Sequence, residues 1–152
     1  MRAGLRPRSL TGEKMADAVT SQTIVDTDKR AIIKLTNLSD GNGESSVEKV
    51  DVSGLNANAK GETPSRVTID QIWYDIGGMR VALEWNASSN VVAIVLGGSA
   101  AAGNVQGHMD FRSFGGIKNN AGGGINGDID LTTSGHTNLD HYTIVLELRK
   151  SY

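Results

Sequence analysis

Oxygen-bearing side chains at alternating positions are the first candidates for chemistry in this chain. Asp40, Asn42 and Glu44 lie within the segment DGNGES, and carboxylate and amide oxygens are the ligands that calcium prefers. An EF-hand loop, however, requires Gly at its sixth position and Glu at its twelfth, where this chain has Ser45 and Asp51. We therefore expect a solvated hairpin loop here, and no calcium site.

Histidines with neighbouring carboxylates form the second candidate. His108 and Asp110 are close in sequence, as are His136, Asp140 and His141. Imidazole and carboxylate would suit a zinc or iron centre if the two segments converged. Their spacing matches no metal-ligand motif, so we expect no metal and no other cofactor, with a surface imidazole where a turn meets a strand.

A pair of carboxylates is the remaining catalytic candidate. The i, i+2 spacing of Asp128 and Asp130 places both on one face of a strand, as a glycosidase pair would require. We expect instead a solvated sheet face. The chain has no G-x-S-x-G nucleophile elbow and no phosphate-binding glycine motif. We therefore predict no catalytic residue and no enzymatic activity.

The elements that position these residues have the period of β-strands. Near the end of the chain, apolar and polar side chains alternate over residues 142–149, which is typical of a half-buried antiparallel strand. The apolar face of this segment carries Tyr142, Ile144, Leu146 and Leu148. Further strand-like runs occupy residues 21–26, 29–39, 46–53, 66–76, 79–85 and 91–96, with turn-forming residues between them. The pattern predicts an all-β fold, a single antiparallel β-sandwich or jelly roll.

Both tryptophans fall in the central runs, where we expect the core. We predict that Trp73 and Trp85 lie on adjacent strands of one hairpin, joined at residues 77–78. Trp85 alternates with Val81 and Leu83, which predicts that it is buried with them. An exposed tryptophan would instead indicate a carbohydrate-binding or host-attachment module.

Glycine is concentrated in residues 97–127, on both sides of a short segment that holds the chain's two phenylalanines. Glycine loses more conformational freedom on folding than other residues, so these loops need contacts that hold them. Either Phe111 and Phe114 insert into the domain's own core, or a neighbouring subunit orders the loops. We predict Phe114 and Ile117 as apolar anchors at a subunit interface.

Length, charge and composition exclude several classes of protein. The 152 residues fit one domain with a real hydrophobic core. Cysteine is absent, so no disulfide or thiolate site can form. A net charge of -2 disfavours nucleic acid as a partner. The longest apolar stretch, residues 91–96, is far short of the about 20 residues of a transmembrane helix, so we expect no membrane partner.

The start of the chain differs in kind from the rest. Residues 1–14 carry Arg2, Arg6 and Arg8 and lack the apolar run of a signal peptide. We expect either a basic, flexible arm that reaches an acidic patch on a partner, or an upstream extension before a natural start at the methionine that follows. Residues 15–152 then form the β-sandwich domain.

Several motifs resemble those of a known family. The segments MADAVTSQTIVD, LTNLSDGNGESSVEKVDVS and DFRSFGGIKNNAGGGINGDIDLTTSGHTNLDHYTIVLELRK, with IDQIWY and ALEWNA between them, are similar to a family of small virion structural proteins of tailed bacteriophages. The resemblance covers residues 15–150. Residues 1–14 are a departure from it.

The resemblance implies a component of the phage particle, made in the host cytoplasm and located in the virion. We expect a capsid decoration, or cement, protein that binds the major capsid protein lattice or other virion proteins as a homo-oligomer, specifically a trimer. A tail, neck or fibre-base component is the alternative among virion proteins. A carbohydrate-binding or host-attachment module is the alternative of another class.

Overall fold

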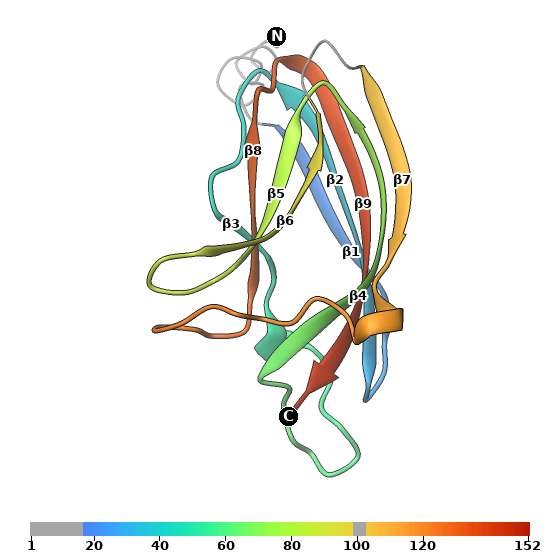
Figure 1. The fold of residues 1–152 in the computed structure, drawn as a ribbon, viewed down its shortest axis with the longest axis vertical. Helices are drawn as coiled ribbons and strands as arrows, with labels where there is room; N and C mark the ends of the chain where they lie inside the picture. Colours follow the sequence, from blue (N-terminus) through green and yellow to red (C-terminus); the bar gives the residue numbers. More distant parts are fainter. Residues whose placement is uncertain (1–16, 99–102) are drawn as a thin grey trace, which may run out of the picture.

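The computed structural model describes residues 17–98 and 103–152, which form a β-sandwich of two antiparallel sheets (Figure 1). In these residues there are nine strands, two short 3-10 helices and no α-helix. The strands are β1 (Ala18–Asp26), β2 (Arg30–Asp40), β3 (Val47–Val50), β4 (Arg66–Gly77), β5 (Arg80–Trp85), β6 (Val91–Gly97), β7 (Asn104–Asp110), β8 (Ile129–Ser134) and β9 (Asn138–Ser151); the 3-10 helices are η3 (Val52–Gly54) and η5 (Arg112–Phe114). The described chain contains no helix with the length and apolar character of a membrane span.

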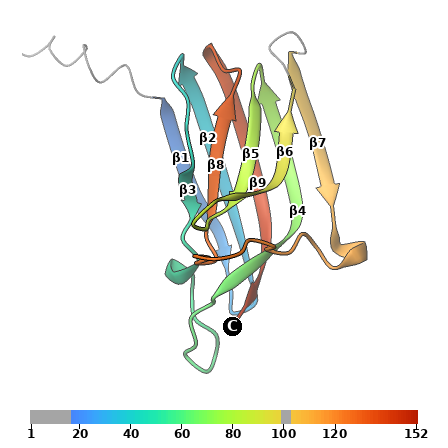
Figure 2. The ribbon, with the colours of Figure 1, turned by 60° about the vertical axis from the view of Figure 1, so that its left-hand side comes forward.

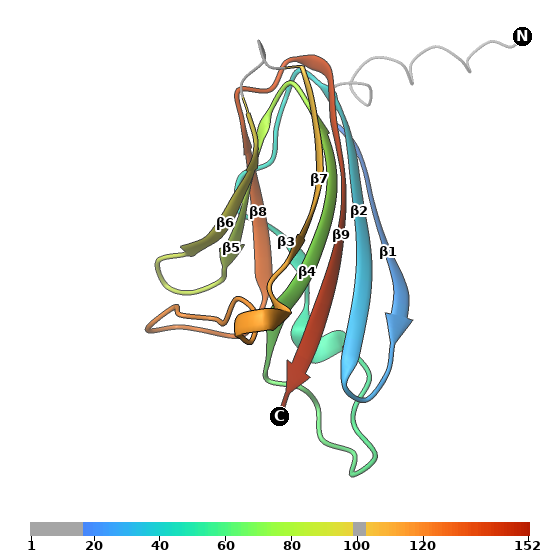
Figure 3. The same ribbon diagram turned by 45° about the vertical axis from the view of Figure 1, so that its right-hand side comes forward.

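The two sheets face each other as separate layers (Figures 2 and 3). One has the order β1-β2-β9-β4-β7 and the other β3-β8-β5-β6. Only the β1–β2 and β5–β6 connections stay within one sheet, and every other connection between the described strands crosses to the opposite layer. The predicted all-β sandwich is confirmed.

Strand β9 lies between β2 and β4 and pairs with both along most of its length. Its predicted alternation is confirmed, because the side chains that face the opposite sheet are fully buried. These are Tyr142, Ile144, Leu146 and Leu148. The outward-facing positions are mixed, since Thr143 is exposed whereas Glu147 is buried by polar neighbours on the same face.

Trp85 is completely buried with Val81 and Leu83, as predicted. The predicted hairpin between Trp73 and Trp85 is wrong, because β4 pairs with β7 and β9 whereas β5 pairs with β6 and β8. The link at residues 77–78 carries the chain from one sheet to the other. Strand periodicity identifies the buried side chains but does not identify the partner strand.

The glycine-rich segment is less irregular than its composition suggests, since residues 104–110 form the edge strand β7. Beyond β7, Phe111 packs into the core. Ile117 exchanges backbone hydrogen bonds with Ile69, at 2.8 and 2.9 Å. Gly116 adopts a φ of 84°, and a Cβ atom there would lie 2.5 Å from Thr68 Cγ2, so only glycine fits. The domain's own core therefore holds this part of the loop.

Replacing Trp85 with Ala tests the packing of the core. We expect the free energy of unfolding to fall by about 3–5 kcal/mol, because a large cavity forms between the sheets. Urea denaturation followed by circular dichroism measures this change. Trp73→Ala is the matched control and should cost much less, because Trp73 faces outward; equal losses would contradict the assignment of the two faces.

Candidate functional site

The calcium-like segment is tied to the sandwich by a buried network centred on Glu44. One carboxylate oxygen of Glu44 accepts hydrogen bonds from Tyr142 Oη at 2.6 Å and Asn37 Nδ2 at 2.8 Å. The other oxygen forms an ion pair with Lys49, and the backbone N–H donates to Thr133 Oγ1 at 2.9 Å. Strands of both sheets therefore meet at one carboxylate. The predicted loop is largely exposed, as at Gly41 and Ser45. It is not a hairpin, because it crosses between the sheets, and Glu44 turns inward.

The other two calcium candidates have local partners. Asp40 Oδ1 accepts hydrogen bonds from the backbone N–H and the side-chain amide of Asn42, both at 3.1 Å, as in an Asx turn.

Burial, together with the carboxylate of Glu44, raises the pKa of Tyr142 far above its usual value. The hydroxyl of Tyr142 therefore remains a hydrogen-bond donor to Glu44.

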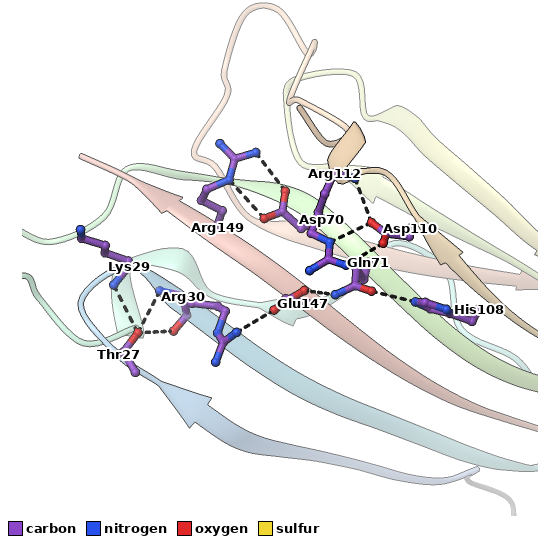
Figure 4. Close-up of polar contacts among 10 residues, drawn as sticks. All are labelled: Thr27, Lys29, Arg30, Asp70, Gln71, His108, Asp110, Arg112, Glu147 and Arg149. Atoms are coloured by element: carbon purple, nitrogen blue, oxygen red, sulfur yellow. Dashed lines mark hydrogen bonds and ion pairs between the residues drawn. The ribbon is translucent and has the colours of Figure 1, made fainter. Parts of the chain in front are cut away.

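The histidines and their carboxylates lie in separate local environments. His108, on β7, hydrogen-bonds through Nε2 to Gln71 at 2.8 Å (Figure 4). Asp110 pairs with Arg112, whose side chain and backbone N–H hold the pKa of Asp110 at about 2. Asp140 accepts from the backbone N–H and hydroxyl of Thr137. Within the described residues, no three His, Asp or Glu side chains are grouped so that they could hold a metal ion.

The expected solvated face around Asp128 and Asp130 is also wrong, because both carboxylates are buried. Asp128 Oδ1 accepts from the backbone N–H of Val52 at 2.9 Å. Asp130 Oδ2 accepts from the side-chain amides of Asn86 and Asn90, at 2.8 and 2.9 Å. The segments that follow β3 and β5 cover this face, and the two aspartates accept the hydrogen bonds that hold these segments in place.

Asp130 also belongs to an acidic row that crosses the four-stranded sheet. Glu48 on β3 and Glu84 on β5 are its direct cross-strand neighbours, and like charges in such positions repel. Partial desolvation raises the pKa of Glu48, with further contributions from Asp128, Asp51 and Asp130, although Glu48 is an exposed residue. This row therefore places like charges next to one another on the sheet, where solvent screens the repulsion at exposed Glu48.

The predicted interface residues have different surroundings. Phe114 on η5 is 67% exposed, although its ring lies 6.1 Å from that of Phe111. Ile117 is half-buried against the core, which leaves less of its side chain available to a partner. The third group of predicted contacts, Arg2, Arg6 and Arg8, lies outside the described residues.

An apolar edge is a feature that the sequence analysis did not single out. β6 is the last strand of its sheet, its sequence VVAIVLG has no charged residue and no proline, and Val92 and Val95 are each about half exposed. At the far edge of the other sheet, Val19 and Ile24 of β1 are also exposed. The unbroken apolar run of β6 could have identified this edge from the sequence. Such a run predicts buried side chains, yet the single domain leaves Val92 and Val95 half exposed.

Trp73 provides the exposed tryptophan that the sequence analysis associated with carbohydrate binding. It is 37% exposed on the outer face of the five-stranded sheet, and its indole stacks on His108. The residues that hold this pair, Gln71 and Glu147, were missed because only the register of β4, β7 and β9 brings them together.

Replacing Glu44 with Ala tests whether its network is structural. We expect a loss of about 3–5 kcal/mol in the free energy of unfolding, because Lys49 is left as an unpaired buried charge. Asp40→Ala, in the same segment, should cost about 1 kcal/mol or less. Urea denaturation measures both. If Glu44→Ala leaves the free energy of unfolding unchanged, and calcium raises the melting temperature of the wild type but not of this variant, Glu44 would instead be a calcium ligand.

The acidic row predicts a pH dependence of stability. Because the pKa of Glu48 is higher in the folded state, its contribution to stability is fully present below its unfolded pKa of about 4.3 and is lost as pH rises through the folded pKa. Glu48→Gln should therefore melt slightly higher than the wild type at pH 7, because solvent screens much of the repulsion at this exposed position, and equally at pH 4. Thermal melts across this range test this, with Glu62→Gln in an exposed loop as the control. A Glu48→Gln variant that is no more stable at pH 7 would contradict it.

Comparison with known proteins assigns no family. No protein-family model matches the chain, and no curated protein matches it at a significant level.

Proposed function

We propose that this chain is a non-enzymatic structural component of a bacteriophage particle, and specifically a capsid decoration protein that binds and stabilises the major capsid protein lattice. The virion would be its final location, after synthesis in the host cytoplasm. The observation that carries this proposal is the unguarded apolar edge at β6. The resemblance of the motifs in residues 15–150 to phage virion proteins is the reason for proposing a phage particle and not another assembly.

Edge strands of proteins that remain monomeric usually carry charged side chains or proline, because an open edge can pair with another chain. β6 has neither, and the side chains of Val92 and Val95 lie opposite Glu84 and Ala82 of β5, so they project from the outer face of the sheet. A partner that covers this edge would gain both strand pairing and burial of apolar surface. Repeated contacts of this type suit a protein that is present in many copies on a lattice.

The strand order supports the same class of protein. If β1 is set aside, β2-β9-β4-β7 faces β3-β8-β5-β6, and we infer that this order is that of a jelly roll with one added edge strand. Jelly rolls are common in viral capsid proteins, and they also occur in lectins. A fold alone does not determine function, so this similarity supports the proposal without carrying it.

The candidate catalytic groups favour a structural role. Glu44 and Asp128 accept hydrogen bonds that hold chain segments to the sandwich, and Asp130 does so through one of its oxygens. Phe114 would add an apolar anchor near η5, and the basic arm of residues 1–14 would add contacts that weaken as salt screens them. We further propose that the assembled form is a trimer.

Charging the proposed interface tests it. We expect Val95→Lys and Phe114→Asp each to weaken assembly by about 2 kcal/mol or more, which is about thirty-fold in affinity, while the domain remains folded. Sedimentation velocity gives the oligomeric state, and rebinding to particles that lack the protein gives occupancy. Val19→Lys, on the opposite edge at β1, is the matched control. Full occupancy for both interface variants, or a loss only in Val19→Lys, would contradict the assignment.

Copy number separates decoration from the alternative of a tail, neck or fibre-base component. Quantitative staining or mass spectrometry of purified particles should give hundreds of copies for a decoration protein. A count that is a small multiple of three or six would reject decoration in favour of a tail component.

A further inference from the structure

A row of polar side chains crosses four strands on the outer face of the five-stranded sheet (Figure 4). Arg30 on β2 pairs with Glu147 on β9 at 3.0 Å, Glu147 hydrogen-bonds to Gln71 on β4, and Gln71 bonds to His108 on β7 at 2.8 Å. Glu147 and Gln71 are buried although they face outward. The row is therefore a built feature of this face, and its side chains have fixed positions.

The direction of these hydrogen bonds determines which ring nitrogen of His108 carries a proton. Gln71 donates through Nε2 to Glu147 Oε1, so its carbonyl oxygen is the atom that faces His108 Nε2. That oxygen can only accept, which requires a proton on Nε2 of His108. The imidazole so held lies parallel to the indole of Trp73, with ring centroids 4.8 Å apart and an interplanar angle of 7°. Trp73 is thus supported in one orientation through a chain of contacts that begins at Arg30.

The exposed part of Trp73 borders a hollow of about 310 Å³ in the sheet surface. Its lining includes Asp75 on β4 and Gln106 on β7, which are cross-strand neighbours, and Thr143 and Val145 on β9. The hollow forms where the small side chains of β9 lie next to the large indole. One carboxylate oxygen of Asp75 is buried and has no hydrogen-bond partner among the described residues, so the carboxylate has capacity to accept further hydrogen bonds.

We propose that this face binds a neutral oligosaccharide, with one pyranose ring placed against Trp73. The electron-rich face of an indole attracts the polarised C–H groups of a sugar ring. The carboxylate of Asp75, the amide of Gln106 and the hydroxyl of Thr143 are groups that pair with sugar hydroxyls. The lining contains a carboxylate and neither Lys nor Arg, which disfavours phosphate or an acidic sugar, although Lys34 is the cross-strand neighbour of the lining residue Val145. This inference goes beyond the proposed assembly role, since it assigns a ligand to a face that β6 and Phe114 do not use.

Binding of defined trisaccharides tests the proposal. Maltotriose, cellotriose and N,N′,N″-triacetylchitotriose are titrated into the full chain, with tryptophan fluorescence as the first readout. Because Trp85 is completely buried, a saturable change reports on Trp73. We expect at least one of the three to bind with a dissociation constant in the millimolar range or below.

Variants then locate the site by calorimetry. Trp73→Ala and Asp75→Ala should each weaken binding at least tenfold while the melting temperature stays close to that of the wild type. Phe114→Ala removes an exposed aromatic ring elsewhere and should bind as the wild type does. Val95→Lys should also retain binding, so that a failure of the assembly proposal is distinguished from a failure of this one.

Three results would overturn the inference. They are the absence of saturable binding by all three trisaccharides, unchanged affinity in Trp73→Ala, and equal loss of affinity in Phe114→Ala. If Trp73→Ala abolishes rebinding to particles while the wild type binds no trisaccharide, the face is a protein interface and the saccharide assignment is wrong.

Discussion

The pairing of β9 with β2 on one side and β4 on the other is the constraint on which most of this structure depends. Because side chains alternate along a strand, one register fixes two surfaces at once. The inner positions supply Tyr142, Ile144, Leu146 and Leu148 to the core. The outer positions place Thr143 and Val145 beside Trp73 and join Glu147 to Gln71. A shift of one residue would exchange these surfaces, removing the core and the proposed binding face together.

Buried polar contacts join distant segments of this chain, as disulfides do in many small β-proteins. Cysteine is absent, and the crossings between the sheets are held by groups such as Glu44, which joins Tyr142 and Lys49. Lys150 plays a similar part, since its amine is fully buried and bonds to Asp26 and to the backbone of Thr27 and Asn56. Each such carboxylate or amine is costly to bury alone, so the segments it joins are favoured to remain together.

The two proposals concern different surfaces of the sandwich. The edge at β6 is apolar and open, as expected of a strand that another protein covers, whereas the outer face around Trp73 has fixed polar groups beside one aromatic ring. A particle protein that presents one surface to the lattice can leave another toward the environment. The two proposals are therefore compatible, yet they rest on different residues.

By itself, the sequence determined the all-β class, the buried face of β9 and the burial of Trp85, because period-two alternation is a local property that survives any choice of partner strand. It also placed the strand-like runs at residues 29–39, 79–85 and 91–96, which form most of β2, β5 and β6. Only the tertiary structure decided that β4 and β5 lie in different sheets, that Glu44, Asp128 and Asp130 are buried, and that Gln71, His108 and Glu147 form one row. These features depend on pairs such as Glu44 and Tyr142, far apart in the chain, and no local pattern specifies which distant strand supplies the partner.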